Sequence, residues 1–341
     1  MKAYVGYSTS ILYWLKNGFD QSDEATVVHV TRINNAAYTS RELMAMQLDL
    51  HGLHESNARG WPSRARKGNR AKKARPSGPA IHVLVPKGVD RNRTGDFERH
   101  CWDSHIPKGS FCALTKKVLV STPGFSFLQM AGLLSTTQLI LVGYWLCASY
   151  KVREDGLVLP VKPVTTKEEL LKFLDDAQGC YGARKARRAL AWVVGNARSP
   201  MEVGTAMLAS LPVRLGGYGL GCPSINYSID ASELDRGTLD HADRKHFEVD
   251  LYWPKHKVGI EYDGVDHLDP AQIRKDKRRI NCLTSNGITI LVVMYDQLAE
   301  KETRATLMNQ LSKLLKASLQ EANEDAREAL LGILFGNEFS L

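Results

Sequence analysis

The clearest pattern of hydrophobic and polar positions lies between residues 199 and 300. Ser199, Pro200 and Glu202 are residue types that begin a helix, and this helix is expected to end near Leu211. Apolar alternation then predicts strands at 224–229, 246–253 and 257–262, a helix at 270–285 that Asn286-Gly287 ends, and an apolar strand at 288–294. The order α-β-β-β-α-β predicts an α/β fold with a mixed sheet flanked by helices.

The pattern is weaker in the first 160 residues. An apolar run at 11–15 that ends at Gly18 predicts a short helix, and strands are expected at 26–30, 81–85 and 117–120. The apolar stretch 125–150 is interrupted by polar residues, which favours a buried helix pair over a membrane span. We therefore expect a separate N-terminal α/β domain, to which the pattern assigns no role.

Helical segments are expected to connect and follow these two regions. Thr165 and Glu168 have the spacing of a capping box, which predicts a helix to about residue 176, and a second helix is expected at 183–196. A long helical pattern runs from 301 to 334. The predicted organisation is an N-terminal domain at 1–160, a helical linker at 161–198, a catalytic-type domain at 199–300 and a C-terminal helix at 301–341.

The positive charge of the chain is concentrated in one segment. The net charge is +8, and residues 59–75, called here the basic loop, hold eight basic residues and no acidic one. The rest of the chain is therefore neutral, and the basic loop points to a polyanion such as DNA. Its basic side chains are Arg59, Arg64, Arg66, Lys67, Arg70, Lys72, Lys73 and Arg75.

Composition excludes several other classes of protein. With 43% hydrophobic and 24% charged residues, the chain is neither collagen-like nor wholly disordered. Its six cysteines include no Cys-x-x-Cys pair, so no zinc ribbon or thioredoxin-type motif is present. The N-terminus has no signal-peptide pattern, and we expect a cytoplasmic protein with no membrane partner.

Acidic residues within the predicted core strands suggest a metal site. Pairing of the two strands around Pro254 would place Asp250 beside Glu261, and alternation would put Asp263 on the same face as Glu261. A single acid of this kind is as often an exposed residue paired with a lysine. Three carboxylates on one face are costly to bury without a cation, so together they favour bound Mg²⁺ or Mn²⁺.

These motifs resemble the PD-(D/E)XK nuclease superfamily. The resemblance rests on Glu202, Asp250, Glu261-x-Asp263-Gly264, His267 and Asp276-x-x-Arg279, and it covers about 200–298. The branch it resembles is the very-short-patch-repair-like endonuclease domain of actinobacterial type, in which some members carry regions similar to AbiEi-type antitoxins. The resemblance implies a restriction-endonuclease-like core that hydrolyses DNA phosphodiester bonds with Mg²⁺.

The resemblance also implies roles for individual residues. Asp250 and Glu261 would bind the metal, with the Tyr262 carbonyl as a third ligand and Glu202 reaching the site from its helix. His267 would act as an acid, a base or a water-orienting group. Lys275, Asp276, Arg278 and Arg279 would organise or contact the phosphate.

One residue departs from the superfamily pattern. Asp263 stands where the superfamily has a lysine, two residues after the metal-binding Glu. Positioning of the attacking water would then depend on His267, Lys275 or a second metal held by Asp263.

Other functions remain open from the sequence. A DNA-binding regulator or antitoxin-like protein with a degenerate nuclease domain would account for the missing lysine, and RNA is an alternative substrate. A homodimer and a partner from a toxin or defence system are compatible with both readings.

We predict that deletion of the basic loop weakens DNA binding and reduces its salt dependence, because phosphate contacts supply sequence-independent affinity. Electrophoretic shifts at several salt concentrations measure both effects. Metal-dependent cleavage at saturating DNA and low salt should persist. Loss of that cleavage would contradict the division of labour between the basic loop and the carboxylates.

Overall fold

The computed structural model of the chain describes residues 2–19, 27–33, 81–87, 97–153, 156–234, 246–263 and 270–336, with only the backbone at 233 and 270–276. The chain forms two compact units, which divide between Gly195 and Asn196. The basic loop lies outside the described residues. Each unit is described below by itself.

The N-terminal unit contains a six-stranded mixed sheet with the order β2-β5-β6-β1-β3-β4. The pairs β1/β6 and β3/β4 are parallel, and the other neighbours are antiparallel. The strands are β1 (Ala3–Val5), β2 (Val27–Val28), β3 (Ile81–Val85), β4 (Phe97–Cys101), β5 (Phe111–Ala113) and β6 (Val118–Ser121). The predicted strand at 81–85 is confirmed, whereas the strand predicted at 26–30 is reduced to two residues.

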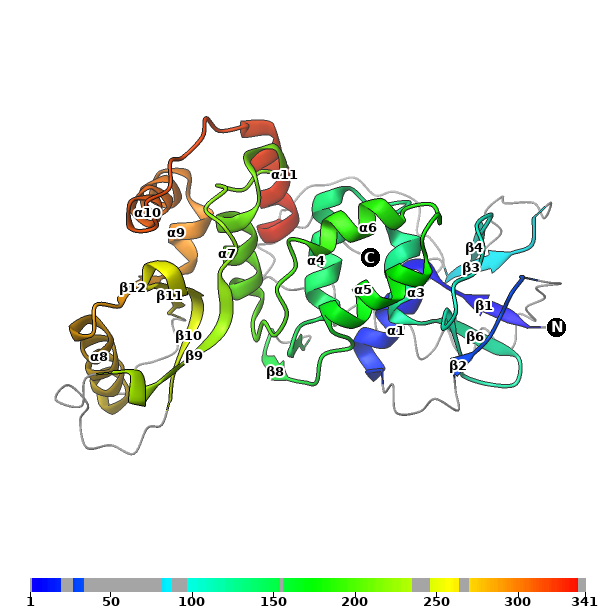
Figure 1. Cartoon of the computed structure of the whole chain (residues 1–341), viewed down its shortest axis with the longest axis horizontal. Helices are drawn as coiled ribbons and strands as arrows, with labels where there is room; N and C mark the ends of the chain where they lie inside the picture. The colour runs from blue at the N-terminus through cyan, green and yellow to red at the C-terminus, as the bar shows by residue number, and fades with distance from the viewer. Residues whose placement is uncertain are drawn as a thin grey trace, which may run out of the picture. The chain divides into compact units, whose positions relative to one another are not determined.

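Helices and one small hairpin complete the N-terminal unit (Figure 1). The predicted buried helix pair at 125–150 is confirmed as two helices that bury most of their side chains. No helix in the described part of the chain is long and apolar enough to cross a bilayer. The elements are α1 (Tyr7–Asn17), α3 (Pro123–Met130), α4 (Thr136–Leu146), α5 (Lys167–Asp176), α6 (Ala183–Leu190), β7 (Tyr150–Val152) and β8 (Val158–Pro160).

Two helix predictions in this unit are wrong in detail. The capping box of α5 is formed by Thr166 and Glu169, one residue later than predicted, and Thr165 instead donates its hydroxyl to the Glu169 carboxylate at 2.8 Å. α6 ends at Leu190 rather than at 196. The reason is tertiary packing, since Val193 is fully buried and its carbonyl accepts a hydrogen bond from Lys167 Nζ.

The C-terminal unit has the predicted element order α-β-β-β-α-β. Its four-stranded sheet has the order β12-β11-β10-β9, with β11 and β12 parallel and the other pairs antiparallel. Figure 1 shows α7 and α8 on opposite sides of this sheet. The elements are α7 (Pro200–Ser210), β9 (Ser224–Asp230), β10 (His246–Trp253), β11 (Val258–Tyr262), α8 (Pro270–Ser285) and β12 (Thr289–Val293). The mixed sheet flanked by helices is therefore confirmed.

Local sequence signals explain the elements of this unit. Ser199 caps α7 by accepting the Glu202 N–H, with Pro200 as the first helical residue. The short helices are η2 (Val213–Leu215), η3 (Ala231–Glu233) and η4 (Pro254–His256), and η4 joins β10 to β11 where the turn is predicted. Gly259 allows close packing in β11, since a Cβ there would approach Val249 and Ile290 to within 3 Å.

The prediction of one long C-terminal helix from 301 to 334 is wrong, because two separate helices follow α9 (Tyr295–Ala299). α10 (Lys301–Leu314) ends in a turn in which the Ala317 N–H donates to the Ser312 carbonyl, and α11 spans Glu324–Phe335. Lys316 has a φ of 52° in this turn, a left-handed conformation that ends a helix. Glycine is the usual residue there, so the sequence carries no clear stop signal.

Arg327 connects α11 by hydrogen bonds to the loop that follows α7. Its side chain is 6% exposed, donates hydrogen bonds to the carbonyls of Gly216 and Gly217, and lies 3.6 Å from the centre of the Tyr218 ring. Burial lowers its pKa. The loop therefore depends on one arginine to satisfy two buried carbonyl groups.

We predict that Arg327→Met destabilises the C-terminal unit by about 2–4 kcal/mol, because both carbonyls lose their donor while the apolar stem is kept. Urea unfolding, followed for the transition of this unit, measures the change. The exposed Arg214 next to the same loop provides the control. Arg214→Gln should change stability by less than about 0.5 kcal/mol, and equal effects of the two variants would contradict the assigned role.

Candidate functional site

Asp250 and Glu261 occupy neighbouring positions on β10 and β11. Leu251 pairs with Ile260, so the next positions along the two antiparallel strands are Asp250 and Glu261. Asn226 on β9 lies opposite Asp250 on the other side, between the pairs Tyr227–Val249 and Ile225–Leu251. Asp250 therefore has Glu261 on one side and Asn226 on the other.

The Asp250 carboxylate is largely buried. Its Oδ2 accepts the backbone N–H of Tyr262 at 2.9 Å. Burial raises the pKa of Asp250, while the Tyr262 hydrogen bond and the positive charge of Arg279 act in the opposite direction. Titratable groups whose pKa values are shifted by burial and by a charged neighbour are often found at functional sites.

Glu202 is the second buried carboxylate, at 6% exposure. Ser199 Oγ donates to its Oε1 at 2.9 Å, and its Oε2 accepts from the Arg198 backbone N–H at 2.8 Å and from Asn226 Nδ2 at 2.6 Å. Burial raises the pKa of Glu202, and the charge of Asp250 raises it further. Glu202 therefore both stabilises the start of α7 and interacts with Asp250.

Glu261 is compensated by an arginine from α8. Its carboxylate forms an ion pair with Arg279, and the two side chains are 13% and 16% exposed. Nη1 of the same arginine donates to the Glu248 carbonyl at 2.8 Å. Arg279 thus joins α8 to both β10 and β11. We refer to Glu202, Asp250 and Glu261 as the carboxylate cluster.

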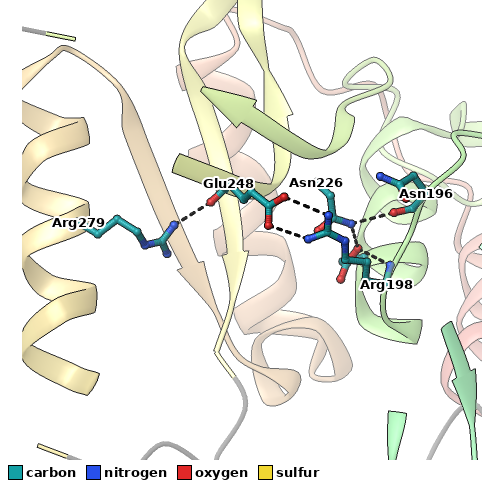
Figure 2. Close-up of polar contacts among 6 residues, drawn as sticks. Asn196, Arg198, Asn226, Glu248 and Arg279 are labelled. Carbon is teal, nitrogen blue, oxygen red and sulfur yellow. Dashed lines mark hydrogen bonds and ion pairs between the residues drawn. The ribbon is translucent and has the colours of Figure 1, made fainter. Parts of the chain in front are cut away.

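A second arginine approaches β10 from the segment before α7. Arg198 donates two hydrogen bonds to the Glu248 carboxylate, at 2.7 and 3.0 Å, and these bonds lower the pKa of Glu248. Figure 2 shows Glu248 between Arg279 on one side and Arg198 with Asn226 on the other. Both arginines therefore contact the same strand next to Asp250.

The remaining predicted site residues differ in where they lie. Asp263 follows the last residue of β11, and its side chain is exposed, unlike the carboxylate cluster. Tyr262 lies within β11 and is in contact with Asp250 through its N–H. Arg278 is exposed on α8. His267 and the basic loop lie outside the described residues, and the side chains of Lys275 and Asp276 are not described.

Three residues of this network are missing from the sequence prediction: Arg198, Asn226 and Glu248. Glu248 had a signal, because it lies two residues before Asp250 on a predicted strand and so shares its face. Arg198 directly precedes the predicted helix cap. Asn226 had no signal in the sequence, because its φ of 49° and its hydrogen bond to Glu202 depend on tertiary structure.

The oxygen atoms of the carboxylate cluster are suitable ligands for a hard divalent cation. Carboxylate oxygens of Asp250 and Glu261, with a backbone carbonyl, are the ligands that Mg²⁺ prefers. The three carboxylates of the cluster do not all have ligand atoms within 4.8 Å of one another. Among the described residues, the group of three that meets this distance is His82, Glu98 and His100, in the N-terminal unit. A cation bound through Glu261 Oε2 would compete with the ion pair between Glu261 and Arg279.

The cluster thus combines buried carboxylates of raised pKa with two guanidinium groups at one end of a strand pair. Such an arrangement can bind a cation, a phosphate group or both. Comparison with known proteins found no matching protein-family model, no matching curated protein and no matching solved structure.

We predict that Asp250→Asn stabilises the protein at pH 7, by about 1 kcal/mol. Burial raises the pKa of Asp250 above its ordinary 3.8, so the folded protein binds this proton more tightly than the unfolded chain. Stability is therefore lost as pH rises above about 4, and the asparagine removes that loss. Urea unfolding between pH 4 and pH 8 should show a difference that grows with pH.

Glu248→Gln is the matched control, with the opposite sign. Arg198 lowers the pKa of Glu248 below its ordinary 4.5, so its ionised form contributes stability above that pH and loses it as pH falls. Because both side chains are about half exposed, the variant should lose no more than about 1 kcal/mol at pH 7. If Asp250→Asn were destabilised at pH 7, as Glu248→Gln is expected to be, burial would not be the main influence on the pKa of Asp250.

Proposed function

We propose that the C-terminal unit is a metal-dependent endonuclease that hydrolyses DNA phosphodiester bonds, with a restriction-endonuclease-like core of the PD-(D/E)XK type. The observation that carries the proposal is the placement of Asp250 beside Glu261 on paired strands of an α-β-β-β-α-β unit. The raised pKa of Asp250 supports it, because a buried carboxylate beside a second acid is suited to a cation.

In this proposal Asp250, Glu261 and the Tyr262 carbonyl hold the metal. Bound Mg²⁺ or Mn²⁺ would supply an activated water and neutralise charge on the phosphate. The Tyr262 N–H fixes the orientation of the Asp250 carboxylate. Glu202 acts from the start of α7 by keeping Asn226 and the Asp250 side of β10 in place.

The arginines supply the contacts to the DNA backbone. A guanidinium group binds a phosphate through two parallel hydrogen bonds, as Arg198 binds Glu248 here. Arg279 would exchange Glu261 for a phosphate oxygen when a cation takes over the carboxylate. Lys275 lies on the same helix, three residues before Arg278 and four before Arg279, and these basic residues would extend the contact.

This chain has no lysine two residues after Glu261 to position the attacking water. Asp263 stands at that position, exposed at the end of β11. This role would fall to His267, to Lys275 or to a second metal held by Asp263.

A second function is favoured by one specific observation. Arg279 already neutralises Glu261, and Glu202 accepts hydrogen bonds from three groups, so these two carboxylates have partners without a metal. A DNA-binding regulator or antitoxin-like protein that keeps the fold and has lost the chemistry would have this network. Cleavage activity separates the two functions.

We predict that the wild-type protein nicks supercoiled plasmid DNA when Mg²⁺ or Mn²⁺ is present, and that Asp250→Asn and Glu261→Gln each lower the rate at least about 100-fold. Gel electrophoresis of the plasmid measures the rate. The control is Glu302→Gln, which removes an exposed carboxylate of α10 in the same unit. Its nicking rate should equal that of the wild type.

Two results would contradict the nuclease proposal. The first is no nicking by wild-type protein that still shifts the DNA, which is the result expected of a regulator. The second is equal nicking by Asp250→Asn, which points to a contaminating enzyme. Labelled DNA and RNA of one sequence, offered together, determine which is the substrate.

A further inference from the structure

Two histidines and a glutamate form a compact group on β3 and β4 of the N-terminal unit. His82 pairs with Glu98, and Leu84 pairs with His100, in the parallel register of these strands. Alternation along β4 places Glu98 and His100 on the same face. One ligand atom from each of the three residues lies within 4.8 Å of the others.

The distances within this group are close to those of a metal site. His82 Nδ1 lies 2.8 Å from His100 Nε2, whereas the Glu98 carboxylate oxygens lie 3.8 Å from the other nitrogen of His82, Nε2, and 3.9 Å from His100 Nε2. In a tetrahedral zinc site with bonds of about 2.0 Å, neighbouring ligand atoms lie about 3.3 Å apart. Each histidine offers one nitrogen to an ion, and the three ligand atoms already lie within 4.8 Å of one another, so a ring rotation that breaks the hydrogen bond between His82 and His100 would admit the ion.

The chemistry of the three side chains selects one class of ion. Two imidazoles and one carboxylate suit Zn²⁺ and related transition metals, whereas Mg²⁺ prefers oxygen ligands alone. Imidazole binds such metals in its neutral form, through one ring nitrogen.

The residues around the group hold the two imidazoles in place. The Tyr7 ring stacks on His100 with ring centres 3.8 Å apart. The His82 backbone is fixed on both sides, since its N–H donates to Thr9 Oγ1 at 2.9 Å and its carbonyl accepts from the Gly6 N–H at 3.1 Å. Such support orients metal ligands before the ion arrives.

Tyr7 itself has an uncommon backbone conformation. Its φ is 57°, a left-handed value that is costly for a bulky residue. Gln129 stabilises this turn by accepting the Tyr7 N–H at 2.8 Å in a buried hydrogen bond. Backbone strain of this kind persists where the surrounding structure fixes it and is often found at functional sites. Here it delivers the ring that packs on His100.

Exposure within the group differs between its members. The side chains of His82 and His100 are 16% and 12% exposed, but that of Glu98 is 44% exposed. The group is therefore accessible to solvent from the carboxylate side. Three protein ligands leave a tetrahedral ion one further position, which water or a substrate atom fills in exchangeable zinc sites.

We propose that His82, Glu98 and His100 form a binding site for a divalent transition metal, Zn²⁺ in particular, with one open coordination position. The site is independent of the proposed nuclease function, since its three residues include two histidines and belong to the other unit. The ion would bind one nitrogen of each neutral imidazole, while each ring keeps its proton on the other nitrogen, and it would neutralise the charge of the Glu98 carboxylate.

Titration of the full-length, chelator-treated protein with Co²⁺, a spectroscopic substitute for Zn²⁺, tests this site. We expect one equivalent to bind with the intense visible absorption of four-coordinate cobalt, and Zn²⁺ to displace it. His100→Gln and Glu98→Gln should each weaken binding at least about 100-fold, more than loss of a supporting contact does. Glu98 is half exposed, so Glu98→Gln tests the site without disturbing the core.

Two control variants define the outcome. His256→Gln removes an exposed histidine outside the group and should bind Co²⁺ like the wild type. Asp250→Asn alters the carboxylate cluster, and the intense four-coordinate Co²⁺ absorption should persist in it. The site is overturned if the wild type shows no such absorption or if Glu98→Gln and His100→Gln bind as tightly as the wild type. Loss of plasmid nicking in Asp250→Asn with Co²⁺ binding retained would separate this site from the nuclease proposal.

Discussion

A carboxylate that leaves water needs a positive charge or hydrogen-bond donors in its place, and the C-terminal unit is organised by this requirement. Each member of the carboxylate cluster has its own compensation. Glu202 receives donors from the start of α7 and from Asn226, Asp250 receives the Tyr262 N–H, and Glu261 receives Arg279. Removal of one of these donors would weaken the compensation of the carboxylate that it contacts.

These compensations also connect the elements of the unit. Arg279 joins α8 to two strands, Arg198 joins the segment before α7 to β10, and Asn226 joins β9 to α7. The helices on the two sides of the sheet are thus linked through charged residues in the middle of β10, in addition to the apolar core around Val249 and Leu283. The place where polar groups converge is therefore fixed by the same contacts that fix the sheet.

Much of this arrangement was predictable from local patterns. The bounds of β10 and α8, and the pairing of Asp250 with Glu261, follow from alternation, a Pro-containing turn and an Asn-Gly stop. The partners of the carboxylates were not, because the choice between Arg279 and a metal depends on where helices lie in space. The end of α10 at a left-handed Lys316 and the parallel pairing that joins His82 to His100 likewise carry no local signal.

The charge balance of the site indicates what can bind there. Among the described side chains, the carboxylate cluster and Glu248 supply four acidic groups, against the guanidinium groups of Arg198 and Arg279. Burial raises the pKa values of Glu202 and Asp250, and the charge of Asp250 adds to the rise at Glu202. A DNA phosphate would add to this excess. Its approach therefore requires prior binding of a cation or proton uptake by a carboxylate, and a divalent cation would neutralise both excess charges at neutral pH.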